Sequence, residues 1–73
     1  MIKDDIGINA GFIWRLLNEK GALSIEEIAE YTDFQLMYIH SAIGWLARED
    51  KIDFFERNDN LYIELINHPE MYF

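Results

Sequence analysis

The sequence predicts an α+β domain in which three helices lead into a C-terminal β-hairpin. Two observations support this order: helically spaced apolar residues fill the first two thirds of the chain, and two alternating segments flank a turn-forming run near its end. The 73 residues suffice for one small domain, with a core over about residues 6–66 and a tail over 67–73. A hydrophobic fraction of 51% is high enough to build a core, so the chain is not expected to be disordered.

The first helix is expected over residues 9–20. Ala10, Ile13, Trp14 and Leu17 follow the i, i+3, i+4, i+7 spacing of one buried stripe. Gly21 is suited to ending this helix, because glycine adopts the left-handed conformation common just after a helix. A very short strand is expected next, at residues 22–23.

The second helix is expected to begin after Ser24. Ser24 and Glu27 have the spacing of a capping box, in which each side chain accepts a hydrogen bond from the other residue's backbone N–H. Glu26, Glu27 and Glu30 are expected to form a solvated acidic face. Asp33 follows, and aspartate tolerates the backbone angles of a tight turn.

The third helix is expected from residue 35 or 36 to residue 49, with an apolar stripe of Leu36, Ile39, Ile43 and Leu46. Asp50 then stands where glycine often ends a helix. Trp14 and Trp45 are expected to pack between the first helix, the third helix and the hairpin.

The hairpin is predicted from strands at residues 52–56 and 61–66, joined by the turn-forming run 57–60. Leu61, Ile63 and Leu65 are expected to point inward, and Phe55 is expected to pair with Tyr62 on the outer face. Two helices joined by a tight turn and followed by a hairpin make a winged helix-turn-helix domain.

The chain resembles a family of small bacterial winged helix-turn-helix proteins of unknown function, DUF2582, over roughly residues 6–66. The resemblance implies a winged helix fold and a regulatory or DNA-binding-like role, and it supplies no catalytic residues. It is carried by Ile6-Gly7, Ala10-Gly11, Ile13-Trp14, Leu17-Asn18, Gly21, Thr32 and the run 42–52. Two departures from the family pattern place apolar groups where similar proteins tend to be polar: Phe12, and Leu36-Met37 at the start of the third helix.

DNA binding is one function that this architecture suggests. Sequence-specific readers use Arg, Lys, Asn or Gln near the start of the recognition helix. The formal net charge of −8 opposes nucleic-acid binding, because fourteen acidic residues outnumber six basic ones. This alternative, a DNA-binding transcriptional regulator using the third helix and the wing, would depend on Gln35, Tyr38, Ser41, Arg57, Asn58 and Asn60.

Protein binding is the function that the sequence favours. Several apolar side chains exceed the needs of one small core, although Leu16 and Leu36 are equally compatible with core positions. We expect a non-catalytic regulatory or scaffolding module that contacts a protein partner or a second copy in a homodimer. The interface candidates are Phe12, Leu16, Leu36, Met37, Tyr38, Met71, Tyr72 and Phe73.

Enzymatic activity is not expected. The chain has no cysteine, no glycine-rich phosphate loop and no nucleophile motif, and its two histidines, His40 and His68, lack a ligand-like spacing with carboxylates. We therefore expect no catalytic residue, cofactor, metal or small-molecule ligand. No signal peptide is evident, and no apolar run approaches the ~20 residues that span a bilayer, so no membrane contact and a cytoplasmic location are expected.

Overall fold

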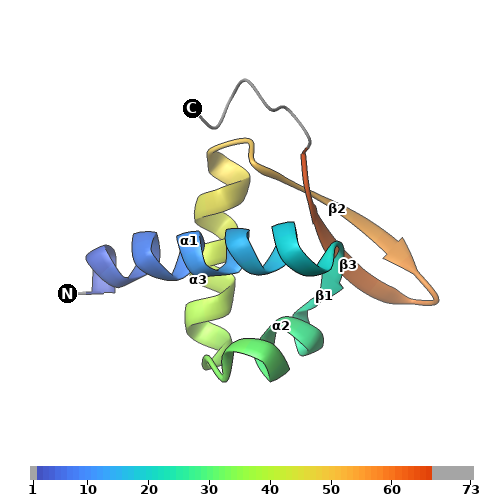
Figure 1. The fold of residues 1–73 in the computed structure, drawn as a ribbon, viewed down its shortest axis with the longest axis horizontal. Coiled ribbons are helices and arrows are strands. Elements are labelled where there is room, and N and C mark those ends of the chain that lie inside the picture. Colours follow the sequence, from blue (N-terminus) through green and yellow to red (C-terminus); the bar gives the residue numbers. More distant parts are fainter. Residues whose placement is uncertain (1, 67–73) are drawn as a thin grey trace.

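A computed structural model describes residues 2–66 of the chain, with side chains from residue 5 onward. The described residues form three helices and a hairpin. Figure 1 shows the hairpin extending to one side of the helices. The α+β winged helix-turn-helix architecture predicted from the sequence is confirmed. In chain order the elements are α1 (Ile2–Lys20), β1 (Leu23–Ser24), α2 (Ile25–Thr32), α3 (Leu36–Arg48), β2 (Ile52–Arg57) and β3 (Asn60–Leu65).

The first helix is longer than predicted. The expected start at residue 9 is wrong, because α1 begins at Ile2. The apolar stripe that predicted the helix starts only at Ala10, which is the first buried residue among the described side chains of α1. The end is where the sequence placed it: Gly21 has a φ of 84°, and its N–H donates to the Leu17 carbonyl at 2.9 Å.

The expected capping box opens α2. The Glu27 N–H donates to Ser24 Oγ at 3.1 Å, and the Ser24 N–H donates to Glu27 Oε1 at 2.9 Å. Asp33 ends the helix in the left-handed conformation with a φ of 60°, and its N–H donates to the Ala29 carbonyl. Both local predictions are therefore confirmed, and Asp33 begins the turn that leads into α3.

The sheet has three antiparallel strands in the order β1-β3-β2. Asn58 and Asp59 form a two-residue turn with φ of 52° and 66°, which suits the tight hairpin connection. Phe55 lies opposite Tyr62 in the register, as predicted. The hairpin strands each extend one residue further toward this turn than expected, because only two residues are needed to join them. The short strand before α2 is one residue later than expected, and its Leu23 pairs with Ile63 of β3.

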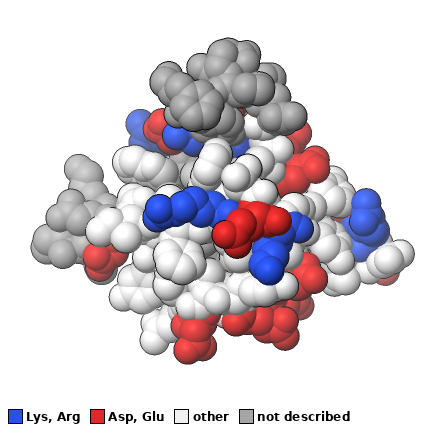
Figure 2. Space-filling view, viewed as in Figure 1, with Lys and Arg blue, Asp and Glu red and all other residues white. Residues whose placement is uncertain are grey.

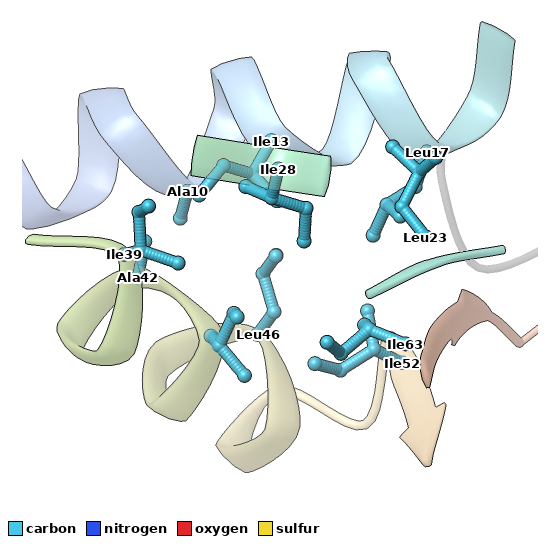
Figure 3. Packing of buried hydrophobic residues seen from close by; sticks show 11 residues of the cluster. Ala10, Ile13, Leu17, Leu23, Ile28, Ile39, Ala42, Leu46, Ile52 and Ile63 are labelled. Carbon is cyan, nitrogen blue, oxygen red and sulfur yellow. The ribbon is translucent and has the colours of Figure 1, made fainter. Parts of the chain in front are cut away.

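The core lies where α1 crosses α3 and where α2 and the sheet close against both helices (Figure 1). Every helix and every strand contributes to it, and Figure 3 shows side chains from these elements pointing toward one another. The buried apolar residues are Ala10, Ile13, Leu17, Leu23, Ile28, Ile39, Ala42, Ile43, Leu46, Ile52 and Ile63.

Two burial predictions are wrong. Leu61 was expected to point into the core, yet 45% of its surface is exposed. Leu61 lies nearer the hairpin turn than Ile63 and Tyr62, the residues of β3 that pair with β1, on the part of the hairpin that extends past the core. Trp45 was expected to be packed between the elements, yet it is 40% exposed, whereas Trp14 is half-buried against the core.

Candidate functional site

An exposed apolar patch lies where α1 meets the turn before α3. The rings of Phe12 and Phe34 are 5.7 Å apart and tilted by 60°, so the patch joins two elements. Leu36 and Met37 follow in the first turn of α3. Phe12, Leu36 and Met37 are 50%, 55% and 57% exposed, respectively, so three large apolar side chains are open to solvent on the two elements that flank Phe34 in space or in sequence. We call these four residues the helix 3 patch.

The other interface candidates differ from this group. Leu16 is half-buried and packs against the core, and Tyr38 is also half-buried. The candidates Met71, Tyr72 and Phe73 lie outside the described residues. Phe34 was not among the predicted interface residues. An aromatic residue in the tight turn between two helices could have indicated a contact with a neighbouring element.

The proposed DNA-contact residues fall into two groups. In the first, Gln35 is exposed at the start of α3, whereas Ser41 is half-buried and its Oγ donates to the Met37 carbonyl at 2.9 Å. That bond directs the hydroxyl back along the helix, away from a reading position.

The second group lies at the hairpin tip, where Arg57, Asn58 and Asn60 are exposed. Arg57 holds its guanidinium carbon 5.3 Å from the centre of the Phe55 ring and 6.0 Å from that of Tyr62. The two rings are themselves stacked, with centroids 5.5 Å apart. These contacts order Arg57 against the outer face of the hairpin.

The charge of the helix-turn-helix unit is negative. Residues 21–47 contain no Lys or Arg, so Arg48 is the only basic residue of α3 and lies in its last turn. The same stretch holds the acidic residues of α2. Figure 2 shows basic side chains interspersed with acidic ones across one face of the molecule and acidic side chains along its lower edge. Residues 21–47 therefore lack the basic side chains by which proteins neutralise phosphates.

A groove of about 470 Å³ lies between α1 and α3, next to Trp45. The sequence does not predict this groove, because the groove depends on how the two helices cross. The buried side chains of Ala10 and Leu46 reach its floor, and Gly7 and Gly11 leave the α1 backbone bare beside them.

The walls of this groove combine aromatic and basic side chains. Trp14 and Trp45 contribute indole rings from the two helices. Arg15 lines it from α1, and Lys51 lines it from the connection between α3 and β2. Among the side chains that the structure describes, no carboxylate lines this groove. Gly7, Gly11 and Trp14 lie on one flank of the buried stripe of α1, and Phe12 lies on the other, so the groove is distinct from the helix 3 patch.

Within the part of the chain that the structure describes, no group of three or more His, Asp or Glu residues is placed to hold a metal ion. The same residues include no helix long and apolar enough to cross a membrane.

Comparison with known proteins places these features in a family. The family model described as a winged helix-turn-helix domain (DUF2582) matches residues 1–65. The chain is 42% identical over 60 residues to the uncharacterized protein MJ1608 of Methanocaldococcus jannaschii, covering 80% of this chain and 84% of that protein.

A solved structure agrees with this assignment. The fold is similar to the solution NMR structure of protein BT2368 from Bacteroides thetaiotaomicron, with a TM-score of 0.82 and 36% identity over 100% of this chain and 89% of that one. The resemblance found in the sequence is thereby confirmed: the chain belongs to the DUF2582 family of winged helix-turn-helix domains.

Proposed function

We propose that the protein is a non-catalytic regulatory or scaffolding module that acts through protein contacts at the helix 3 patch. The observation that carries this proposal is the exposure of Leu36 and Met37 at the start of α3, directly after Phe34, whose ring contacts the exposed Phe12. In a DNA-binding winged helix this is where base-reading side chains stand. Aromatic residues and methionine are instead enriched at protein interfaces.

The electrostatics support the same choice over the alternative, a DNA-binding transcriptional regulator. A DNA-binding protein would have to approach phosphates through a helix-turn-helix unit that carries acidic residues and has no Lys or Arg before Arg48. Two features favour DNA: the exposed Gln35 at the start of α3, and the exposed hairpin tip with Arg57, Asn58 and Asn60. Arg57 alone neutralises few phosphates, and affinity for DNA depends on how many are neutralised.

A double substitution separates the two functions. Leu36→Lys with Met37→Lys adds two charges to the patch, which should abolish a protein contact and strengthen any DNA contact. Phe54→Lys with Leu61→Lys is the matched control, because it adds the same charges at two exposed apolar residues of the hairpin. Circular dichroism and thermal unfolding should first show that both variants are folded.

Three measurements then distinguish protein binding from DNA binding. Sedimentation equilibrium up to millimolar concentration tests the homodimer, which should dissociate in the patch variant and persist in the control. A photo-crosslinking amino acid at position 37, compared with one at position 54, tests for a different protein partner in cells. Fluorescence anisotropy with pooled random duplexes at low salt tests DNA. Three results together would favour DNA binding over protein binding. The protein would be a monomer, it would give no protein adduct from position 37, and it would bind duplex more tightly after the patch substitution.

A further inference from the structure

The part of the chain that carries most of the helix 3 patch has acidic side chains and no basic ones. Residues 21–47 contain no Lys or Arg and hold four acidic residues, Glu26, Glu27, Glu30 and Asp33. Asp33 is exposed directly before Phe34 of the patch, and Glu30 is exposed near the end of α2. Figure 2 shows acidic side chains along the lower edge of the molecule, where Figure 1 places α2 and the turn into α3. The patch therefore adjoins an acidic surface.

Helix α1 brings charges of both signs to the same side. Arg15 and Glu19 line a shallow depression together with Phe12 of the patch, so their two charges offset each other. Lys20 Nζ lies 5.2 Å from the centre of the Tyr31 ring of α2. Residues 12–47 thus contain five acidic and two basic side chains, a formal charge of −3 with histidine neutral. The bases of α1 reduce the negative charge around the patch and do not cancel it.

A second copy of the chain does not complement this surface. In a two-fold dimer the same patch meets itself, so each acidic surface would oppose its own copy. Like charges that face each other across an interface oppose association. Nucleic acids and anionic lipids are repelled for the same reason. A basic partner is the one whose charge complements the patch.

The backbone at the patch indicates what shape of partner fits. The patch lies on two helices and the turn between α2 and α3, away from the sheet, so it offers no strand edge to which an extended segment could pair. A helix meets its own backbone hydrogen bonds and binds through an apolar stripe of side chains. The exposed side chains of Phe12, Leu36 and Met37 provide the apolar surface that such a stripe can cover.

We propose that the helix 3 patch binds an amphipathic helix of a partner protein, whose apolar stripe is flanked by lysine or arginine side chains. The stripe covers Phe12, Leu36 and Met37, and the basic side chains lie beside Glu30 and Asp33. This inference rests on the function proposed above, because it specifies the partner of the same surface.

Nuclear magnetic resonance titration of the full chain tests the proposal. The probe is a peptide of two copies of the heptad Ala-Leu-Lys-Lys-Leu-Ala-Lys, acetylated and amidated at its ends, whose leucines form one stripe of a helix. One counterpart replaces every Lys by Glu, and another replaces every Leu by Ala. We expect the Lys-Leu peptide to shift the methyl signals of Leu36 and Met37, with a dissociation constant of about 0.1–1 mM. Both counterparts should bind at least about fivefold more weakly.

Salt separates a basic partner from a second copy. Raising the salt concentration from about 20 mM to about 500 mM shortens the screening length from about 20 Å to about 4 Å. Binding of the Lys-Leu peptide should weaken at least about fivefold, whereas a dimer of two acidic surfaces would become tighter. Shifts of Leu36 and Met37 that appear on raising the protein concentration alone, and that grow with salt, would assign the patch to a second copy and overturn the proposal.

The charge contact has its own variant. Glu30→Gln with Asp33→Asn should weaken the Lys-Leu peptide by about threefold or more at low salt. Asparagine is suited to position 33, because it tolerates the left-handed conformation there. Glu56→Gln with Glu64→Gln is the matched control, since it removes the same charge from two exposed positions of the hairpin. The control should change the affinity by less than about twofold. Equal losses would mean that the peptide follows the net charge of the chain, and would overturn the proposal.

The apolar contact uses the double lysine variants described above. Leu36→Lys with Met37→Lys should abolish measurable binding of the Lys-Leu peptide. Phe54→Lys with Leu61→Lys changes the net charge equally and should keep at least half of the affinity. Nuclear Overhauser contacts between residues 67–73 and Met37 in the free protein would assign the patch to the chain's own C-terminal segment and overturn the proposal.

Failure of this inference is distinguishable from failure of the proposed function. A protein adduct from position 37 in cells, together with no binding of the Lys-Leu peptide, would overturn the basic helix and leave protein binding at the patch in place. Absence of both the adduct and the peptide complex would overturn both.

Discussion

Phe12 and Phe34 come from different parts of the chain, yet their rings are 5.7 Å apart with an interplanar angle of 60°. This tilted contact ties the middle of α1 to the turn before α3. Phe34 also packs against the core, whereas half of the Phe12 surface remains exposed. The pair therefore holds Phe12 in place at the edge of the helix 3 patch and leaves part of its ring open to solvent.

A double-mutant cycle should detect this contact. Phe12→Ala and Phe34→Ala, alone and combined, should show a coupling of about 0.5–1 kcal/mol in the free energy of unfolding measured with urea. The control cycle combines Phe12→Ala with Phe55→Ala, because Phe55 stacks on Tyr62 of the hairpin. The control pair should be additive within about 0.5 kcal/mol. Additivity in both cycles would mean that the two rings do not support each other in solution.

The capping box predicts a second, independent stability effect. Ser24→Ala removes the acceptor for the Glu27 N–H and should lower the free energy of unfolding by about 1 kcal/mol. Ser41→Ala is the matched control, since its hydroxyl only bonds back to the Met37 carbonyl within α3. That substitution should change stability by less than about 0.5 kcal/mol. Equal losses in the two variants would contradict a specific role for the cap.

Local signals were the ones that could be predicted from the sequence. Ser24 with Glu27, and Asp33, act through neighbours a few residues away, so their spacing is sufficient to identify them. Phe55 and Tyr62 could be paired because the turn between them sets the register of the hairpin. The start of α1 at Ile2 could not be predicted, because the apolar stripe marks only the part of a helix that is buried.

Features that depend on the tertiary arrangement were not predictable. Leu61 alternates correctly with Ile63, but the sequence does not show how short β1 is or how far the hairpin extends beyond it. The groove beside Gly11 depends on how α1 crosses α3 and on Trp45 lying at the surface.

Asp50 should limit stability through its backbone conformation. Its φ of 61° is one that glycine adopts without strain, so Asp50→Gly should raise the free energy of unfolding by about 0.5–1 kcal/mol. Glu49→Gly, at the neighbouring φ of −84°, should instead lower it by a similar amount. Asp50→Asn removes the same charge without freeing the backbone. Thermal unfolding of the three variants should therefore separate the effect of backbone strain from the effect of charge. A gain in Asp50→Asn as large as in Asp50→Gly would assign the effect to charge at the helix end.

The hairpin offers a comparison in which the smaller deletion should cost more. Ile63→Val removes one carbon from a fully buried side chain and should lower the free energy of unfolding by about 0.5–1.5 kcal/mol. Leu61→Ala removes three carbons from a side chain that is largely open to solvent, two positions along the same strand. It should cost less than about 0.5 kcal/mol, because little apolar surface is returned to water. Urea unfolding at low protein concentration measures both. A larger cost for Leu61→Ala would show that another part of the protein covers the hairpin in solution, which the described residues do not.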